Sequence, residues 1–235
     1  MKSRIWSQAD WICGLTTGLV AFFVYLWTVA PNVTLLDSGE FIVAAQHFGV
    51  AHPPAYPLWT LLVWFFQLLP LGNAAWEINV FSSVCGALAV TVGTMLFSSS
   101  TRWMLGDALN RWRGLTSTAA LSIGLLFAFS FSMWSQATIT EVYTLHALLI
   151  GLYLVSLYVW LRRPESLGWL LFPFFLLAFS FSNHQLSLSL APLPFLAVLL
   201  VRRSIFWDLV VAAMLTMLIV FLGFAILSGE LPVLK

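Results

Sequence analysis

Charged residues are scarce in this chain of 235 residues, where they make up 8% of the sequence. A soluble domain carries about 25% charged residues, so the scarcity excludes an ordinary soluble protein. Hydrophobic types fill 61% of the positions instead. Several runs reach the length of about 20 apolar residues that crosses the hydrocarbon core of a bilayer as a helix. The composition therefore predicts an all-α, polytopic membrane protein.

Three further shortages narrow the classes of partner and cofactor. The net charge is only +1, which gives no electrostatic attraction for nucleic acid, and no nucleic-acid partner is expected. Only two cysteines occur, Cys13 and Cys85, and both lie inside apolar runs, as core residues rather than a disulfide or metal ligands. No linker rich in Pro, Gly or Ser interrupts the sequence, so we predict a single transmembrane domain over residues 1–235.

The apolar runs predict seven membrane spans and a first outer loop with helices at the membrane surface. We interpret residues 1–31 as a retained signal anchor, since their apolar run is longer than that of a cleaved signal. Residues 32–74 form the predicted outer loop, and residues 75–228 hold six further spans. Within the loop, residues 57–69 are too few to span and contain Trp and Phe, which suit the headgroup boundary. The predicted spans are 11–31, 75–99, 115–134, 137–161, 167–183, 185–201 and 206–228.

The basic residues predict the orientation of the chain. If residues 57–69 stay at the surface, every Lys and Arg before Lys235 falls on one face. Lys and Arg concentrate in cytoplasmic loops, so the N-terminus is predicted to be cytoplasmic and the active face extracytoplasmic, in a bacterial inner membrane or an ER-type membrane. Asp10 is expected to be a solvated partner of these basic groups. The residues concerned are Lys2, Arg4, Arg102, Arg111, Arg113, Arg162, Arg163, Arg202 and Arg203.

The outer loop contains two acids three positions apart, Asp37 and Glu40, in "DSGEFIVAAQHFG". This spacing places both carboxylates on one face of a helix over residues 37–47. Asp37 can cap that helix, Glu40 can complete a capping box, and Gly49 can end it, while Phe48 belongs to its apolar stripe. Two interpretations stay open: the acids serve only as a helix cap, or they form part of a site at the membrane surface.

The next segment, "HPPAYP", predicts a rigid elbow. Pro53 restricts His52 to extended backbone, and the prolines prevent the preceding helix from continuing. The elbow would present His52 and Tyr56 at a defined place, although a simple turn at the point of membrane entry would have the same sequence. Ionisable groups at a membrane boundary indicate a functional site, and we therefore treat His52 and Tyr56 as candidates for substrate binding.

Two later segments are predicted to reach the same face. "TITEVYTLHALL" begins the span 137–161, with Glu141 in its first turn, where the helix dipole favours a carboxylate, and Tyr143 deeper. His146 is expected to be a hydrogen-bonded core residue. "FSNHQ" predicts a tight turn between two spans, formed by Asn183 and His184.

From the residues alone, three classes of function stay open: a general-base site for group transfer, a metal site, or a substrate or proton path in a transporter. No compact ligand spacing such as His-x3-His occurs, so no metal ligands are assigned. A transporter more typically places its charges near the bilayer midplane, whereas the ionisable groups here gather at the outer rim. That placement favours chemistry on a lipid-borne or extracytoplasmic substrate.

The ordered set "DSGEF…AA…FGVAHPPAYPLW", "WSQATITEVYTLHALL" and "FSFSNHQ" resembles the multi-span membrane family related to protein O-mannosyltransferases, which has the GT-C glycosyltransferase fold. The resemblance implies a lipid-phosphate sugar donor of the polyprenyl- or dolichyl-phosphate hexose type. It implies inverting transfer to a hydroxyl of a protein or glycan acceptor on the outer face. By motif, the catalytic base would be Asp37, with Glu40 as the second candidate.

The chain departs from the family pattern in two respects. Family members usually have glycine at the position of Ala55, and alanine takes a positive φ only at a cost. Family members also continue through more spans. A lipid-phosphate leaving group calls for a cation or a metal, and the outer face offers only Lys235, His52 and His184. A divalent metal or a partner membrane protein that supplies the missing spans would meet this need. A non-catalytic subunit that docks to a partner complex is the alternative function, and a transporter is a third.

Overall fold

The computed structural model describes residues 4–35, 37–70, 72–106 and 113–228. All regular structure in these residues is helical, which confirms the prediction of an all-α protein. The chain forms two compact units, Met1–Ser189 and Leu190–Lys235. Each unit is described by itself, and the predicted single domain over residues 1–235 stays a prediction.

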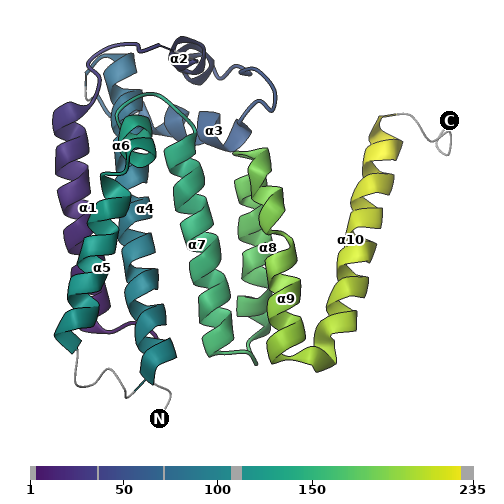
Figure 1. Cartoon of the computed structure of the whole chain (residues 1–235). Helices are drawn as coiled ribbons and strands as arrows, with labels where there is room; N and C mark the ends of the chain where they lie inside the picture. The colour runs from purple at the N-terminus through teal and green to yellow at the C-terminus, as the bar shows by residue number, and fades with distance from the viewer. Residues whose placement is uncertain (1–3, 36, 71, 107–112, 229–235) are drawn as a thin grey trace. The chain divides into compact units, whose positions relative to one another are not determined.

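Unit 1 is a helical bundle arranged around one long central helix, α4 (Figure 1). Helix α4 packs against α1, α5, α6 and α7, and α7 packs in turn against α8. Small residues allow the close approach of these helices, since a Cβ at Gly18 of α1 would lie 1.8 Å from the hydroxyl oxygen of Thr91 on α4. The helices are α1 (Gln8–Thr28), α4 (Ala74–Leu105), α5 (Arg113–Ala128), α6 (Phe131–Ala137), α7 (Tyr143–Arg162) and α8 (Leu167–Phe181).

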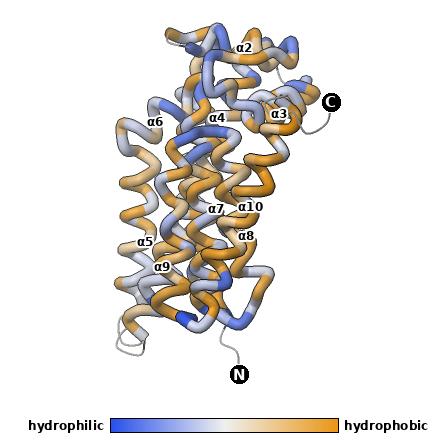
Figure 2. Tube along the Cα trace, turned by 90° about the vertical axis from the view of Figure 1, so that its right-hand side faces the viewer, coloured by the Kyte–Doolittle hydropathy of each residue, from blue (hydrophilic) through white to orange (hydrophobic). Residues whose placement is uncertain are grey.

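Four helices in the described part of the chain are long and apolar enough to cross a membrane: α1, α4, α7 and Arg203–Leu227. A fifth span results if Gly114–Ala128 and Phe131–Ala137, which are bent by 60°, count as one. Two further predicted spans correspond to shorter apolar helices, Leu167–Phe181 and Gln185–Val201. The membrane character is confirmed, while the total of seven spans and the GT-C fold stay predictions. Hydrophobic residues cover the helices, and hydrophilic segments gather towards helix ends and turns (Figure 2).

The predicted start of the span 137–161 is wrong, because α7 begins at Tyr143. The preceding backbone is held by other elements instead. The carbonyl of Thr138 accepts a hydrogen bond from the amide of Ala30 at 2.9 Å, and the carbonyl of Thr140 accepts one from the hydroxyl of Ser38 at 3.1 Å. Glu141 consequently lies in a loop before the helix.

Two short helices cover one end of unit 1, which we call the loop end. Helix α2 (Ser38–Gln46) and helix α3 (Pro57–Phe66) pack on each other and on α4. Their buried side chains, among them Phe41 and Trp59, share one apolar cluster with residues of α4 and α7. This confirms the helices predicted in the first loop. Phe48, by contrast, is exposed and follows the end of α2 at a positive φ of 53°, so its predicted place in the apolar stripe of the helix is wrong.

Arginine side chains mark the opposite end of unit 1, the arginine end. Arg102, at the end of α4, donates hydrogen bonds to Ser7 and to Asp10 at the start of α1. Asp10 is completely buried, which contradicts the prediction of a solvated partner. The capping box that Ser7 and Asp10 form at the N-terminus of α1 draws the carboxylate into the bundle. Further arginines at this end are Arg4, Arg162 and Arg163.

Unit 2 contains α9 (Pro192–Val201), a turn of 3₁₀ helix (Arg203–Ile205) and α10 (Phe206–Leu227). Within the described residues of α10, only Ala225 is buried. A helix that is apolar on all sides suits contact with lipid or with further helices.

Candidate functional site

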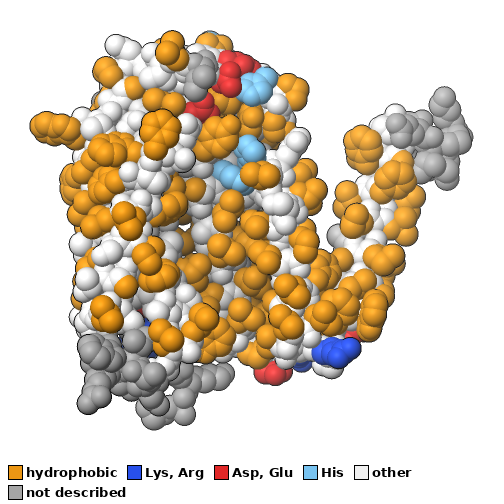
Figure 3. All heavy atoms as spheres, viewed as in Figure 1, with side chains coloured by type: hydrophobic (Ala, Val, Ile, Leu, Met, Phe, Trp, Pro, Cys, Tyr) orange, Lys and Arg blue, Asp and Glu red, His pale blue; other side chains and the backbone are white. Residues whose placement is uncertain are grey.

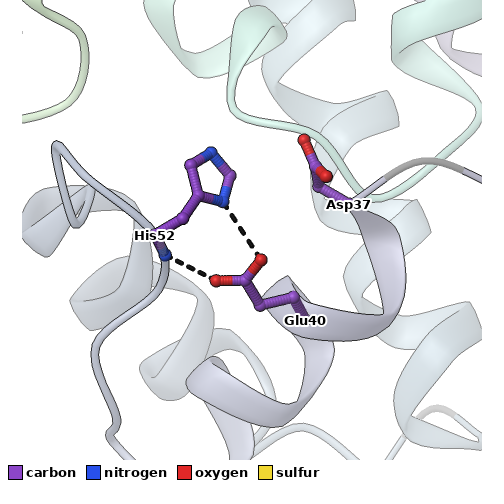
Figure 4. Close-up of side chains that lie close together, drawn as sticks. All are labelled: Asp37, Glu40 and His52. Atoms are coloured by element: carbon purple, nitrogen blue, oxygen red, sulfur yellow. Dashed lines mark hydrogen bonds and ion pairs between the residues drawn. The ribbon is translucent and has the colours of Figure 1, made fainter.

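Asp37, Glu40 and His52 lie together at the loop end of unit 1 (Figure 4). Asp37 precedes α2, Glu40 lies in its first turn, and His52 belongs to the elbow before α3. One potential ligand atom from each of the three side chains lies within 4.8 Å of the other two. Acids and histidines are also visible at this end in the space-filling view (Figure 3). The structure therefore brings together the two predicted catalytic acids and the elbow histidine.

Glu40 uses both carboxylate oxygens to hold the elbow. Its Oε1 accepts a hydrogen bond from the backbone N–H of His52, and its Oε2 lies 3.1 Å from Nδ1 of the same histidine. The backbone hydrogen bond from His52, followed by the side-chain hydrogen bond, lowers the pKa of Glu40. The predicted capping box is wrong, because Glu40 faces the elbow and Asp37 makes no side-chain cap hydrogen bond. The carboxylate of Asp37 is thus exposed, whereas that of Glu40 is engaged by His52.

His52 connects Glu40 to Tyr56 through its two ring nitrogens. A carboxylate on Nδ1 favours the His52 tautomer whose Nε2 is an acceptor. Nε2 lies 3.3 Å from the hydroxyl of Tyr56, which can donate to it. The Pro53–Pro54 peptide bond is cis, and both following residues have a positive φ, 75° at Ala55 and 47° at Tyr56. Ala55, where the family resemblance predicts glycine, therefore has a left-handed backbone.

Replacement of Ala55 by glycine is expected to stabilise the protein by about 1 kcal/mol, because glycine removes the steric cost of a Cβ at positive φ. Ala87→Gly inside α4 is the control and is expected to destabilise by about 1 kcal/mol. The free energies of unfolding can be compared by denaturant titration in the same detergent. Equal destabilisation by both substitutions would contradict the left-handed conformation at Ala55.

A second group of rings continues from Tyr56 towards α7 and α8. The ring centroid of His184 lies 6.4 Å from that of Tyr56, 5.6 Å from that of Tyr143 and 4.7 Å from that of His146. His146 is buried, and no described residue provides a hydrogen-bond partner for its Nε2. The prediction of a hydrogen-bonded core residue is confirmed, since Nδ1 of His146 lies 3.5 Å from the hydroxyl of Ser187, but the contact of His146 with His184 was not predicted. Its position one helical turn after Tyr143 places both residues on the same face of the helix, and this spacing could have indicated its place beside the site.

Two further predicted site residues, Asn183 and Glu141, are buried. Asn183 is fully buried and donates a hydrogen bond from Nδ2 to the carbonyl of Val142 at 3.3 Å. This bond ties the turn after α8 to the start of α7. Glu141 is buried as well, and burial raises the pKa of its carboxyl group, while a hydrogen bond from the backbone of Val142 opposes the shift. The negative charge of Asp37 raises the pKa of Glu141 further. The loop between α6 and α7 therefore interacts electrostatically with Asp37.

Acidification from pH 7.5 to 5.5 is expected to destabilise the protein through His184. Burial lowers the pKa of His184 below 6.5, and its Nδ1 accepts a hydrogen bond from the amide of Leu186 at 3.2 Å. Below pH 6.5 the unfolded chain binds this proton more readily than the folded one, so stability falls as the pH falls. His184→Gln should show a smaller drop in unfolding temperature over this pH range than the wild type. The same drop in both proteins would contradict the assignment to His184.

The site also offers donors for a divalent metal ion. Two carboxylates and one imidazole form a set of three ligands that leaves coordination positions open, as in catalytic zinc sites. A metal on Nδ1 of His52 would have to replace its contact with Glu40. Among the described Lys and Arg side chains, none forms an ion pair with Asp37, Glu40 or Glu141. Lys235, the predicted outer cation, lies outside the described residues.

Comparison with known proteins identifies relatives of this chain. The family model described as the N-terminal domain of protein O-mannosyl-transferase TMEM260 matches residues 37–207. The protein O-mannosyl-transferase tmem260 of Dictyostelium discoideum is 31% identical over 163 residues, which cover 68% of this chain and 18% of that protein. Protein O-mannosyl-transferase TMEM260 of Mus musculus is 34% identical over 148 residues, 60% of this chain and 19% of that protein.

The chain spans about a fifth of the length of these curated relatives. No solved structure matches it. The family match begins at Asp37 and includes every predicted site residue, and it covers well over half of the sequence. The chain therefore belongs to the family of the N-terminal domain of protein O-mannosyl-transferase TMEM260.

Proposed function

We propose that this chain takes part in the transfer of a hexose from a polyprenyl- or dolichyl-phosphate donor to a hydroxyl group of an extracytoplasmic protein or glycan, with Asp37 as general base. The names of the relatives support an O-mannosyl transfer and hence mannose as the hexose. The observation that carries the proposal is the exposed carboxylate of Asp37 beside the Glu40–His52 pair.

The proposed reaction is a single displacement at the anomeric carbon. Asp37 takes the proton of the acceptor hydroxyl while the hydroxyl oxygen attacks the anomeric carbon. The bond between the anomeric carbon and the phosphate oxygen breaks, and its electron pair leaves with the lipid phosphate. A single displacement of this kind inverts the configuration at the anomeric carbon.

Glu40 serves this reaction as a positioning residue. Its oxygens are engaged by His52, and the lowered pKa makes its carboxylate a weaker base. By fixing His52, it also holds Tyr56 beside the acid pair. Hydroxyl and imidazole donors from Tyr143 and His184 would bind the departing phosphate by charge-assisted hydrogen bonds.

The two ends of unit 1 support the proposed orientation in the membrane. Arg4, Arg102, Arg162 and Arg163 lie at the end opposite to Asp37. If that end is cytoplasmic, as the distribution of basic residues in membrane proteins favours, the loop end is extracytoplasmic. The site would then meet a lipid-linked sugar at the headgroup level.

The donor phosphate also needs a positive counter-charge. We propose that it comes from a divalent metal at Asp37, Glu40 and His52, or from a partner membrane protein that corresponds to the further length of the relatives. A metal bound through Asp37 would compete with its role as a base, so activity that rises on addition of a chelator would favour the partner.

The direct test is transfer from radiolabelled polyprenyl-phosphate mannose to a serine- and threonine-containing peptide in vesicles that hold the chain. We expect a mannosylated peptide whose anomeric configuration is opposite to that of the donor. Retention of configuration would exclude the single displacement. If wild-type protein in vesicles with purified candidate partners gives no transfer, the role as a non-catalytic subunit is favoured instead.

A further inference from the structure

A cavity of about 400 Å³ is lined in part by Tyr143, whose ring centroid lies 5.6 Å from that of His184. It lies between the end of α5, α6 and the first turns of α7, at the loop end of unit 1. This volume is in the range of sites for small ligands. The residues that line it are Phe127, Ser130, Ser132, Met133, Gln136, Tyr143, Thr144 and Ala147.

The cavity exists because the helix is broken between α5 and α6. The hydroxyl of Tyr25 donates to the carbonyl of Ala128 at 2.6 Å, and the hydroxyl of Ser83 donates to the carbonyl of Ala137 at 2.6 Å. Trp134 adds a hydrogen bond from its indole N–H to the hydroxyl of Thr28 at 2.9 Å. Bonds from α1 and α4 thus hold α6 in its bent position, so the cavity is part of the folded structure.

Two polar atoms of the lining lack partners. Thr144 is 1% exposed, and its hydroxyl oxygen has no hydrogen-bond partner among the described residues. Its methyl group lies close to Gly86 of α4, which leaves the hydroxyl on the other branch of Cβ. The amide oxygen Oε1 of Gln136 is likewise buried without a described partner. Buried polar groups in native proteins are nearly always paired, so both atoms point to a ligand.

The lining also defines the chemistry of that ligand. None of the lining residues is charged, so the cavity offers no cation for a phosphate. It combines hydroxyl and amide groups with Phe127, Met133 and the ring of Tyr143. A ligand that carries hydroxyl groups on one side and C–H groups on the other matches both kinds of surface. A neutral hexose ring has this character.

We propose that the cavity binds the hexose ring of a substrate, with hydrogen bonds to Thr144 and Gln136 and with Tyr143 at the side of the cavity that contacts His184. The inference rests on the proposed hexose transfer and specifies where its sugar lies. Two sources share this chemistry: the hexose of the lipid-phosphate donor, and a hexose already attached to the acceptor.

The test is binding to the purified full chain, measured as the rise in unfolding temperature on addition of ligand. The probes are methyl α-mannoside, a short-chain polyprenyl-phosphate mannose and a mannosylated peptide. Thr144→Val keeps the shape of the side chain and Gln136→Met keeps its length, and each removes one hydrogen-bonding group. Thr118→Val is the matched control, since the Thr118 hydroxyl is satisfied by the carbonyl of Gly114 at 2.9 Å and does not line the cavity.

We expect methyl α-mannoside to bind at least tenfold more weakly to Thr144→Val and to Gln136→Met, and equally well to Thr118→Val and the wild type. Thr144→Val should unfold at the same temperature as the wild type or higher without ligand, because it removes an unpaired buried hydroxyl. If the two variants also bind the lipid-phosphate mannose more weakly, the cavity holds the donor hexose. If only the binding of the mannosylated peptide is weakened, the cavity holds the acceptor hexose. Unchanged binding of all three probes would overturn the proposal.

The binding readout separates this inference from the proposed function. Full transfer by Asp37→Asn would refute the general base and leave the hexose cavity standing. Wild-type affinity in Thr144→Val would refute the cavity and leave the general base standing.

Discussion

Asp37→Asn is expected to lower the rate of hexose transfer by about 10²–10⁴-fold, the range over which general-base catalysis contributes. Asparagine has nearly the same shape and cannot accept the proton. Because the side chain of Asp37 is exposed and makes no cap hydrogen bond, the substitution should leave the unfolding temperature unchanged. The initial rate of labelled mannose transfer at saturating donor measures the effect.

Two comparisons make this result specific. Asp208→Asn changes an exposed acid in the first turn of α10 and should transfer mannose at the wild-type rate. Glu40→Gln keeps one acceptor oxygen for the elbow and should lower the rate of transfer by only about tenfold, because one of the two hydrogen bonds to His52 is kept. If Glu40→Gln abolished transfer while Asp37→Asn did not, the roles of the two acids would have to be exchanged.

The sequence predicts the helices of the bundle better than their ends. The apolar runs locate α1, α4 and α7 because hydrophobic length is a property of the segment alone. The start of α7 escapes prediction because the carbonyls of Thr138 and Thr140 are taken by Ala30 and Ser38, which lie more than 100 residues away. The bend before α6 depends in the same way on Tyr25 of another helix.

For the candidate site, too, the sequence predicts which residues are involved but not all of their contacts. Motif spacing identifies Asp37, Glu40 and His52 as polar groups on one face, and the structure brings them together. Motif spacing cannot decide what Glu40 contacts, since a capping box and a hydrogen bond to the elbow would both satisfy the carboxylate. The place of His146 beside the site was not predicted, because a histidine inside an apolar helix has the sequence pattern of a core residue. Its contact with His184 arises only when α7 and the turn after α8 meet.

Asp10→Ala, at the other end of the bundle, is expected to lower the free energy of unfolding by about 3 kcal/mol. The carboxylate of Asp10 is completely buried and accepts hydrogen bonds from the amide of Ser7 at 2.8 Å, the hydroxyl of Ser98 at 2.7 Å and the guanidinium of Arg102 at 2.5 Å. Removal of one partner from a buried ion pair costs about 3–5 kcal/mol. We place the effect at the low end because the side chain of Arg102 is 36% exposed and can be solvated.

Denaturant titration measures this loss, and Asp208→Ala, which removes an exposed acid, should change stability by less than about 0.5 kcal/mol. Folded Asp10→Ala protein should still transfer mannose at the wild-type rate per folded molecule, since the arginine end takes no part in the proposed reaction. A loss of transfer without a loss of stability would contradict this separation. The two acids differ in their hydrogen bonds: the carboxylate of Asp10 is fully satisfied within the fold, whereas that of Asp37 is exposed, as the proposed role of general base requires.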